Sequence, residues 1–415
     1  MMNAPDWNQP LAALPERCEV LVVGAGPAGS ACARLLAHAG RDVVLVDAQA
    51  FPRDKVCGDG LVPDTHAALR RLGMHERVMA LAQRAKAAQC VAPSGSFIDV
   101  PGELAVLPRR ELDALLCEGA VEAGARMVAP ARFISPLRDG NGRVIGARLG
   151  HAGATHDIQC RWLVLATGAT PAAMLAADLC ERRTPSAMAL RTYVRHPGMV
   201  DAIPNLRFVW HRRLSGGYGW IFPAPGGMFN IGVGLLDSHT SAADGTPRKA
   251  RNLRELFDDF LAVDPIAARL MREGESLGEL KGAPLRCDLE GAKWRAPGVL
   301  VAGEAAGATY AFTGEGIGKA LETGIAAAEC LAAGMDQDDE VVLADYRCRL
   351  DALRPRFEMF RKAASFNRYP LLVSLVVWRA RHSQRMTARL SDILNERRMP
   401  GSLLSWRGFK GMMFG

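Results

Sequence analysis

The segment EVLVVGAGPAGSACARLLAHAGRDVVLVD, residues 19–47, decides the fold of this chain. Glu19 to Val23 is nearly all apolar, which is typical of a strand in the buried centre of a parallel sheet. A glycine-rich turn follows, then a helix pattern rich in Ala and Leu from Ser30 to His38, and a second apolar strand from Arg41 to Asp47. Strand, glycine turn, helix and strand in this order form one βαβ unit.

The turn itself, Gly24-Ala-Gly26-Pro-Ala-Gly29, has the spacing of a dinucleotide-binding fingerprint. Gly24 permits the tight turn, Gly26 lets the backbone approach a pyrophosphate, and Gly29 lets the helix pack closely on the sheet. The helix N-terminus supplies N–H groups and a partial positive charge for phosphates. Asp47 ends the second strand, 18 residues after Gly29, where its carboxylate can accept hydrogen bonds from ribose hydroxyls. The segment therefore predicts a dinucleotide site.

Two further strands of the buried type lie far along the chain. Trp162 to Ala166 leads into Thr167-Gly168, and Val299 to Ala302 leads into Gly303-Glu304. Because these pieces are widely separated, we expect the nucleotide domain to be discontinuous. Between them, residues 188–236 alternate and contain aromatics, which is typical of an inserted antiparallel sheet.

Composition narrows the class of protein. The chain has 415 residues, a net charge of +7, and 6% aromatic residues with no aromatic pairs inside a basic strand, so we predict no nucleic-acid partner. Its ten cysteines include no C-x-x-C pair, and no His stands at ligand spacing from a Cys, so we predict no metal site and a reducing cytoplasmic location. Residues 1–17 lack the pattern of a signal peptide, and no run of about 18 apolar residues predicts a membrane span.

The glycine turn alone fits both FAD and NAD. The segment VLVAGEAAGATYAFTGEGIG, residues 299–318, favours FAD because it adds a second carboxylate and a second glycine-rich helix start. An NAD-dependent dehydrogenase has no need of such an element so far downstream.

At this point the chain resembles the geranylgeranyl reductase family, within the p-hydroxybenzoate-hydroxylase-like flavoproteins. Four motifs carry the resemblance, over residues 18–335: the glycine turn with Asp47, FPRDKVCGDGL (51–61), YGWIFP (218–223), and Gly303-Glu304 with GEGI (314–317). It implies an α/β fold with a discontinuous Rossmann-type FAD-binding domain (16–75, 105–180 and 285–340). An inserted antiparallel β-sheet substrate domain (76–104 and 181–284) and a C-terminal basic helical region (341–415) complete the predicted architecture.

The resemblance also implies the residues that hold FAD. Asp47 matches the adenosine ribose position, Arg109 an arginine that reaches the cofactor, and Val128 a backbone position at adenine. The predicted cofactor-binding residues are Gly24, Gly26, Pro27, Ala28, Gly29, Asp47, Arg53, Lys55, Cys57, Gly58, Arg109, Val128, Thr167, Gly168, Gly303, Glu304, Gly314, Gly316 and Ile317. Thr167-Gly168 stands where many hydroxylases have Asp-Gly, which weakens the expectation of hydroxylase-type handling of NAD(P)H.

Cys57 is the first candidate catalytic residue. A cysteine is more often a buried structural thiol, but the family loop that contains Cys57 packs beside the flavin. Arg53 and Lys55 stand nearby in sequence, so we expect a lowered pKa and more thiolate character.

Tyr218, Trp220 and Phe222 are the other candidate catalytic residues. They alternate, so on a strand their side chains share one face. Such a face forms either core or the wall of an apolar tunnel, and the motif match favours a tunnel wall suited to a prenyl chain. Flavin halogenases have paired tryptophans here, which this chain lacks.

The end of the chain is strongly basic. Residues 347–410 contain 15 Lys or Arg and four Asp or Glu. The apolar segment 369–378 is followed by Arg379, Arg381, Arg385 and Arg389. We predict either a helix packed on the substrate domain with a solvated basic face or contact with the anionic inner face of a membrane.

The functional prediction is an FAD-dependent oxidoreductase that reduces C=C bonds of an isoprenoid lipid or quinone tail. NAD(P)H or a reduced electron carrier would supply the electrons. The alternatives are a flavin monooxygenase that hydroxylates an aromatic or protein-borne substrate, and a maturation factor that acts on a partner protein.

Overall fold

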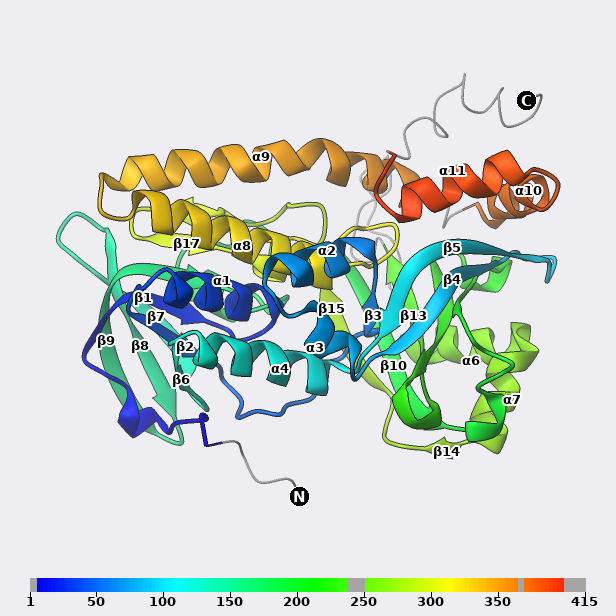
Figure 1. Ribbon diagram of the computed structural model, residues 1–415, viewed down its shortest axis with the longest axis horizontal. Coiled ribbons are helices and arrows are strands. Elements are labelled where there is room, and N and C mark those ends of the chain that lie inside the picture. Colours follow the sequence, from blue (N-terminus) through cyan, green and yellow to red (C-terminus); the bar gives the residue numbers. More distant parts are fainter. Residues whose placement is uncertain (1–5, 237–250, 365–368, 399–415) are drawn as a thin grey trace.

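The computed structural model of the chain describes residues 6–236, 251–364 and 369–398 (Figure 1). The predicted inserted domain and C-terminal region therefore lie partly outside the described residues, at 237–250, 365–368 and 399–415. Two sheets lie side by side along the long axis of the molecule. The helices α8 (Ile317–Gly334) and α9 (Asp339–Ala363) run along one side of the first sheet, as Figure 1 shows.

The first sheet has eight strands among the described residues, in the order β16-β17-β9-β1-β2-β6, with β8 paired to β9 and β7 to β8. The five strands from β17 to β6 are parallel, and β16 runs antiparallel to β17. The bounds are β1 (Arg17–Val23), β2 (Val43–Val46), β6 (Arg126–Val128), β7 (Arg132–Arg138), β8 (Val144–His151), β9 (Ala154–Leu165), β16 (Arg295–Ala296) and β17 (Val299–Val301). The predicted βαβ unit and its discontinuous continuation are confirmed.

Helices cover this sheet. The described ones near it are α1 (Pro27–His38), α2 (Pro63–Arg71), α3 (His75–Met79), α4 (Arg109–Glu122) and α5 (Ala172–Ala176). Helix α1 begins at Pro27, directly after the N-cap Gly26, which suits proline because the first helical N–H has no partner in any case. Short 3₁₀ segments occur at η1 (Leu11–Ala13), η2 (Pro197–Met199), η3 (Arg212–Leu214), η4 (Pro225–Gly227) and η5 (Gly303–Ala306).

The second sheet has nine strands among the described residues, in the order β14-β10-β13-β12-β11-β4-β5-β3, with β15 paired to β10. Its bounds are β3 (Gly60–Leu61), β4 (Gln83–Val91), β5 (Phe97–Val106), β10 (Ala187–Arg195), β11 (Leu206–Val209), β12 (Gly217–Ala224), β13 (Met228–Leu236), β14 (Glu275–Ser276) and β15 (Lys281–Leu285). Its pairs are antiparallel, as predicted, except that β4 and β11 are parallel. Strands β6 to β9 of the first sheet lie between β4 and β11 in the chain, so no hairpin joins β4 to β11.

The predicted domain boundaries cut across this sheet. Strand β3 lies inside the segment 16–75, yet it pairs with β5 of the second sheet. The short strand brings the loop of Cys57 against the second sheet. The division into an FAD-binding and a substrate domain at the predicted residues stays a proposal.

The two faces of the second sheet have different cover. Helices α6 (Leu253–Val263) and α7 (Pro265–Glu273) bury one face through Leu256, Phe257 and Phe260. The helices α10 (Pro370–Arg381) and α11 (Gln384–Leu394) pack on β5, where Val377, Ala380 and Met386 meet Ile98 and Val100. Helices α10 and α11 thus pack on the second sheet.

Close backbone packing holds α1 in the middle of the first layer. A Cβ added at Gly29 would overlap the carbonyl oxygen of Gly24, and a Cβ added at Gly324 of α8 would overlap that of Ala28. Helix α1 therefore lies against the strand turn on one side and against α8 on the other.

We expect Gly29→Ala to lower the free energy of unfolding by about 1–3 kcal/mol, because the new methyl group meets backbone that has no freedom to move aside. Urea unfolding of the purified protein measures this. Gly140→Ala is the matched control, since a Cβ there meets nothing within 4 Å. Equal stability of the two variants would show that the packing is looser than described.

Candidate active site

The glycine turn after β1 requires its glycines for different reasons. Gly24 has a φ of +100°, and a Cβ there would overlap the carbonyl oxygen of Ala166 at the end of β9. Gly26 differs, because a Cβ there meets only the guanidinium groups of Arg53 and Arg109, each at 3.7 Å. The turn thus leaves open space at Gly26, beside the start of α1, with two cations facing it. This arrangement fits a pyrophosphate.

Two buried carboxylates position these cations. Asp113 is fully buried and binds Arg109 through two hydrogen bonds of 2.7 and 2.8 Å and Arg53 at 3.0 Å. Asp47 accepts the backbone N–H of Ala25 at 2.9 Å and lies 3.4 Å from Arg53. The predicted residues Asp47, Arg53 and Arg109 are therefore in one cluster at the turn.

Two of the predicted residues flank this cluster. Val128 ends β6 beside Asp47, whose backbone N–H donates to the Val128 carbonyl at 3.4 Å. Thr167 follows β9, and its Oγ1 is buried without a hydrogen-bond partner among the described residues. A buried hydroxyl needs a partner, so an unpaired one at this edge indicates a group that the polypeptide does not supply.

The late glycine-rich element lies against the early one. A Cβ added at Gly303 would come 2.7 Å from the Cβ of Ala28 in α1, and the Lys55 ammonium is 3.8 Å from Glu304. Gly314 has a φ of +71°, and Gly316 is the N-cap of α8, which begins at Ile317. The early turn at Gly24 and the late element at Gly303 are almost 280 residues apart in the chain. They thus converge around the space beside Gly26.

The Cys57 loop connects this space to the second sheet, but the expected thiolate character is wrong. Burial, followed by the nearby Asp59 carboxylate, raises the pKa of the Cys57 thiol, and Arg109 and Lys55 do not offset it. Sequence neighbours suggested cations, whereas the fold places the half-buried Cys57 side chain beside an acid. The raised pKa favours the thiol over the thiolate.

Asp59 is the central residue that sequence reasoning did not select, although it stands in the CGDGL motif. It is fully buried, and its backbone has a φ of +63°. Its carboxylate accepts hydrogen bonds from the Tyr193 hydroxyl, from the Asn230 side-chain amide at 2.7 Å and from the backbone N–H of Arg109 at 3.3 Å. Burial raises the pKa of Asp59 to about 6, against the lowering effect of the bonds from Tyr193 and Asn230. One buried acid therefore connects the second sheet to the start of α4.

The three predicted aromatics share one face of β12. Tyr218, Trp220 and Phe222 are 5–7% exposed, with neighbouring ring centroids 6.2 Å apart. Phe208 of the adjacent β11 and Trp210, directly after that strand, extend the group at 5.0–5.7 Å. Sequence reasoning missed them although they alternate in the same way. The hydroxyl of Tyr218 donates to the Thr313 carbonyl, so this aromatic face adjoins the late glycine-rich element.

Trp220 also belongs to the polar network. Its Nε1 donates to Asn230 at 2.9 Å, and the Asn230 amide donates to the Cys57 carbonyl at 2.7 Å. The aromatic face and the Cys57 loop are therefore fixed relative to each other through one asparagine.

Comparisons with known proteins agree with this geometry. A family model described as an FAD binding domain matches residues 17–193. A menaquinone reductase of Mycolicibacterium smegmatis is 34% identical over 339 residues, which are 77% of this chain and 77% of that protein. The chain belongs to the geranylgeranyl reductase family of FAD-dependent oxidoreductases. Digeranylgeranylglycerophospholipid reductase 2 of Methanopyrus kandleri is 30% identical over 323 residues, 77% of this chain and 78% of that one.

Solved structures share the fold of this family member. A geranylgeranyl bacteriochlorophyll reductase-like protein from Thermoplasma acidophilum superposes with a TM-score of 0.76 at 20% identity, over 94% of this chain and 99% of that one. A flavin-dependent brominase gives 0.74 at 18% identity, over 96% and 97%. The predicted fold class and FAD are confirmed.

We expect Gly26→Val to fold but to retain at most about one tenth of the flavin that the unmodified protein binds. The valine methyl groups would enter the space of the pyrophosphate. We expect the free protein to tolerate the change, since an added Cβ lies 3.7 Å from the guanidinium groups of Arg53 and Arg109, an ordinary contact distance. Flavin absorbance and circular dichroism of the purified variant measure both effects. A folded Gly26→Val protein with stoichiometric FAD would contradict the site.

Proposed function

We propose that this family member saturates C=C bonds in the prenyl chain of a lipid or quinone. The observation that carries the proposal is a pair of relatives at 34% and 30% identity, since menaquinone and digeranylgeranyl lipids both carry polyprenyl chains. FAD, once bound and reduced, supplies the hydride for such a reduction. The chain must bind the prenyl group, orient one double bond and hold a proton.

The proposed cofactor site consists of the converging segments described above. The cluster of Arg53 and Arg109 at Gly26 would face the pyrophosphate, and Asp47 would face the ribose. Thr167 has a free buried hydroxyl for a polar group of the cofactor. The late element from Gly303 to Ile317 would surround the remainder of the cofactor, because Gly303 lies directly against Ala28 of the early glycine turn.

The substrate site adjoins it at the aromatic face of β12. Tyr218, Trp220 and Phe222 offer an apolar wall that suits a flat or flexible hydrocarbon. Cys57, as a protonated thiol beside Asp59, can hold a proton next to that wall, which a thiolate could not do. We assign no nucleophilic role to this cysteine.

The second candidate, a flavin monooxygenase, rests on fold alone, because a solved structure described as a probable FAD-dependent monooxygenase is only 20% identical. Mass spectrometry of the product separates the two. We expect a gain of two hydrogens per reduced double bond when the protein acts on menaquinone or a geranylgeranylated lipid with chemically reduced flavin. Incorporation of oxygen, with no hydrogenated product, would contradict the reductase.

Trp220→Phe tests the aromatic wall within the same assay. The hydrogen bond to Asn230 contributes about 1 kcal/mol to holding the ring in place. Without it we expect kcat/KM to fall about fivefold while FAD stays bound. Trp294→Phe is the matched control, because the Nε1 of Trp294 is buried and has no hydrogen-bond partner among the described residues. Identical kinetics in both variants would contradict a positioning role for Trp220.

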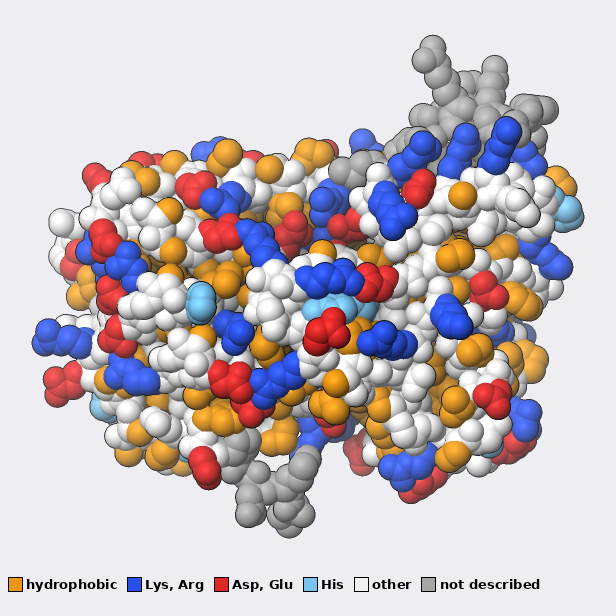
Figure 2. Space-filling model, viewed as in Figure 1, with side chains coloured by type: hydrophobic (Ala, Val, Ile, Leu, Met, Phe, Trp, Pro, Cys, Tyr) orange, Lys and Arg blue, Asp and Glu red, His pale blue; other side chains and the backbone are white. Residues whose placement is uncertain are grey.

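We further propose that the C-terminal helices place the enzyme on an anionic membrane surface. None of the described helices is both long enough and apolar enough to cross a membrane. Helix α10 exposes Leu371 (70%) and Trp378 (55%), and basic side chains gather over α10 and α11 in Figure 2. Exposed apolar and cationic side chains on one surface favour a lipid interface.

We expect the protein to co-sediment with vesicles containing phosphatidylserine and much less with vesicles of phosphatidylcholine. Each Arg contributes about 1 kcal/mol near an anionic surface, so replacing Arg381, Arg385 and Arg389 by Gln should weaken binding about a hundredfold. A triple Gln variant at the exposed Arg110, Arg132 and Arg183 is the control of equal charge. Equal sedimentation with both kinds of vesicle, or equal loss in both variants, would contradict this surface.

A further inference from the structure

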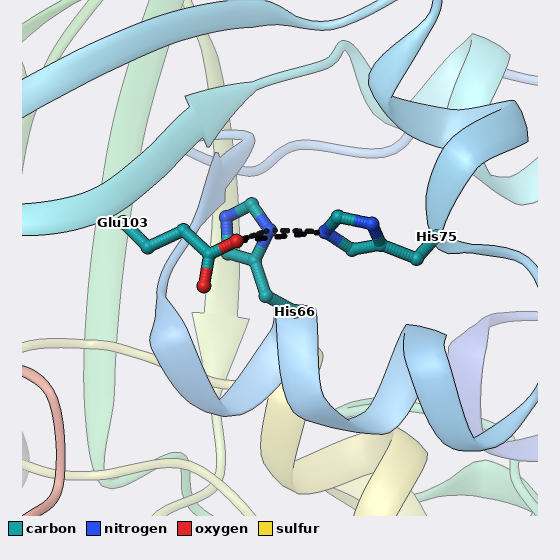
Figure 3. A group of neighbouring side chains, drawn as sticks. All are labelled: His66, His75 and Glu103. Carbon is teal, nitrogen blue, oxygen red and sulfur yellow. Dashed lines mark hydrogen bonds and ion pairs between the residues drawn. The ribbon is translucent and has the colours of Figure 1, made fainter.

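A cluster of two histidines and a glutamate lies apart from the flavin site. His66 is in α2, His75 begins α3, and Glu103 is in β5 (Figure 3). The cysteine-based reasoning that predicted no metal site did not consider these residues. In Figure 2 histidine side chains reach the surface between basic and acidic ones, in the area where α2 and α3 lie.

Three ligand atoms face one another in this cluster. The His66 Nδ1 and the His75 Nε2 are 3.1 Å apart, and the Glu103 Oε1 is 3.7 Å from each of them. A point equidistant from three atoms with these separations lies about 2.0 Å from each, which is the length of a Zn–N or Zn–O bond.

The protonation of His75 suits a ligand. Its other ring nitrogen, Nδ1, lies 2.9 Å from the Glu76 carboxylate. A carboxylate at one imidazole nitrogen fixes the proton there and leaves a lone pair on the other, as is usual for metal-bound histidines. The Nε2 of His75 therefore presents a lone pair to the centre of the cluster.

His66 contributes the buried side of the cluster. It is 1% exposed, whereas Glu103 on the other side of the cluster is partly exposed. The cluster therefore reaches from the interior to the surface.

We propose that His66, His75 and Glu103 form a site for a single divalent cation of the zinc type, with water at the fourth position. Two imidazoles and one carboxylate are ligands that Zn²⁺ favours, and the partly exposed Glu103 provides an entry path from solvent. The site is separate from the flavin reaction and does not depend on the proposed function.

One neighbouring charge competes with the cation. The Arg70 guanidinium pairs with the same Glu103 oxygen that faces the histidines. Both side chains are about half exposed, so the pair is weak and Arg70 can move to the second carboxylate oxygen or into solvent. Binding of the cation therefore requires this pair to rearrange.

The consequence of binding is a cross-link between three elements. Glu103 lies two residues before Ala105 of β5, which pairs with Leu61 of β3 at the end of the Cys57 loop. The cation would thus tie α2 and α3 to the strand that supports this loop. We expect it to stabilise the fold there and not to take part in the chemistry.

Zinc content and thermal unfolding test the proposal on the FAD-bound protein. After removal of metals with EDTA and dialysis against micromolar Zn²⁺, the protein should retain one equivalent by elemental analysis and unfold several degrees higher. His75→Gln and Glu103→Gln should each lose both effects. Glu103 is partly exposed, so its variant should fold normally even where His75→Gln does not.

Three further variants sharpen the result. Arg70→Gln should bind Zn²⁺ several-fold more tightly, and Glu76→Gln about tenfold to hundredfold more weakly, because it removes only the carboxylate behind His75. His151→Gln, at an exposed position, should bind like the unmodified protein. Absence of retained zinc, or equal zinc binding by Glu103→Gln, would overturn the site and leave a hydrogen-bonded cluster without a metal.

Discussion

The buried carboxylate of Asp59 is the constraint on which the arrangement of the site depends. It accepts hydrogen bonds from β10, from β13 and from the start of α4, which belong to the two different layers of the molecule. A buried acid without these donors would be strongly destabilised, so the donors must be present for the loop to keep its shape. The loop in turn fixes where Cys57 and β3 lie. Asp59 therefore sets the distance between the cofactor layer and the aromatic face.

A second buried acid organises the cofactor side in a similar way. Asp113 binds Arg53 and Arg109 together, and both guanidinium groups extend toward Gly26. Asp47 lies 3.4 Å from Arg53, so two buried carboxylates face these two cations. A diphosphate at the glycine turn would accept charge-assisted hydrogen bonds from the guanidinium N–H groups that extend toward Gly26. The two arginines thus add hydrogen-bond donors to the shape of the turn.

The sequence predicted the parts of the fold whose requirements are local. Gly24 and Gly29 act through backbone contacts a few residues away or at the next strand, so their spacing identifies the turn without a structure. Asn230 could not be predicted in the same way, because its bonds to Trp220 and Asp59 depend on strand register and on a loop 171 residues away. The pKa of Cys57 was predicted in the wrong direction for a related reason. Neighbours in sequence reveal charges, but only the fold reveals burial.

Strand β5 connects features that are distant along the chain. Its end at Val106 pairs with Gly60 behind the Cys57 loop, and Glu103 reaches the two histidines. Its other half packs against α10 and α11, and the Pro101 carbonyl accepts from Ser391 at 2.7 Å. A Cβ at Gly102 would come 2.7 Å from a Leu394 methyl group, so α11 contacts the strand closely. The proposed membrane surface, the proposed cation site and the Cys57 loop therefore all contact this one strand.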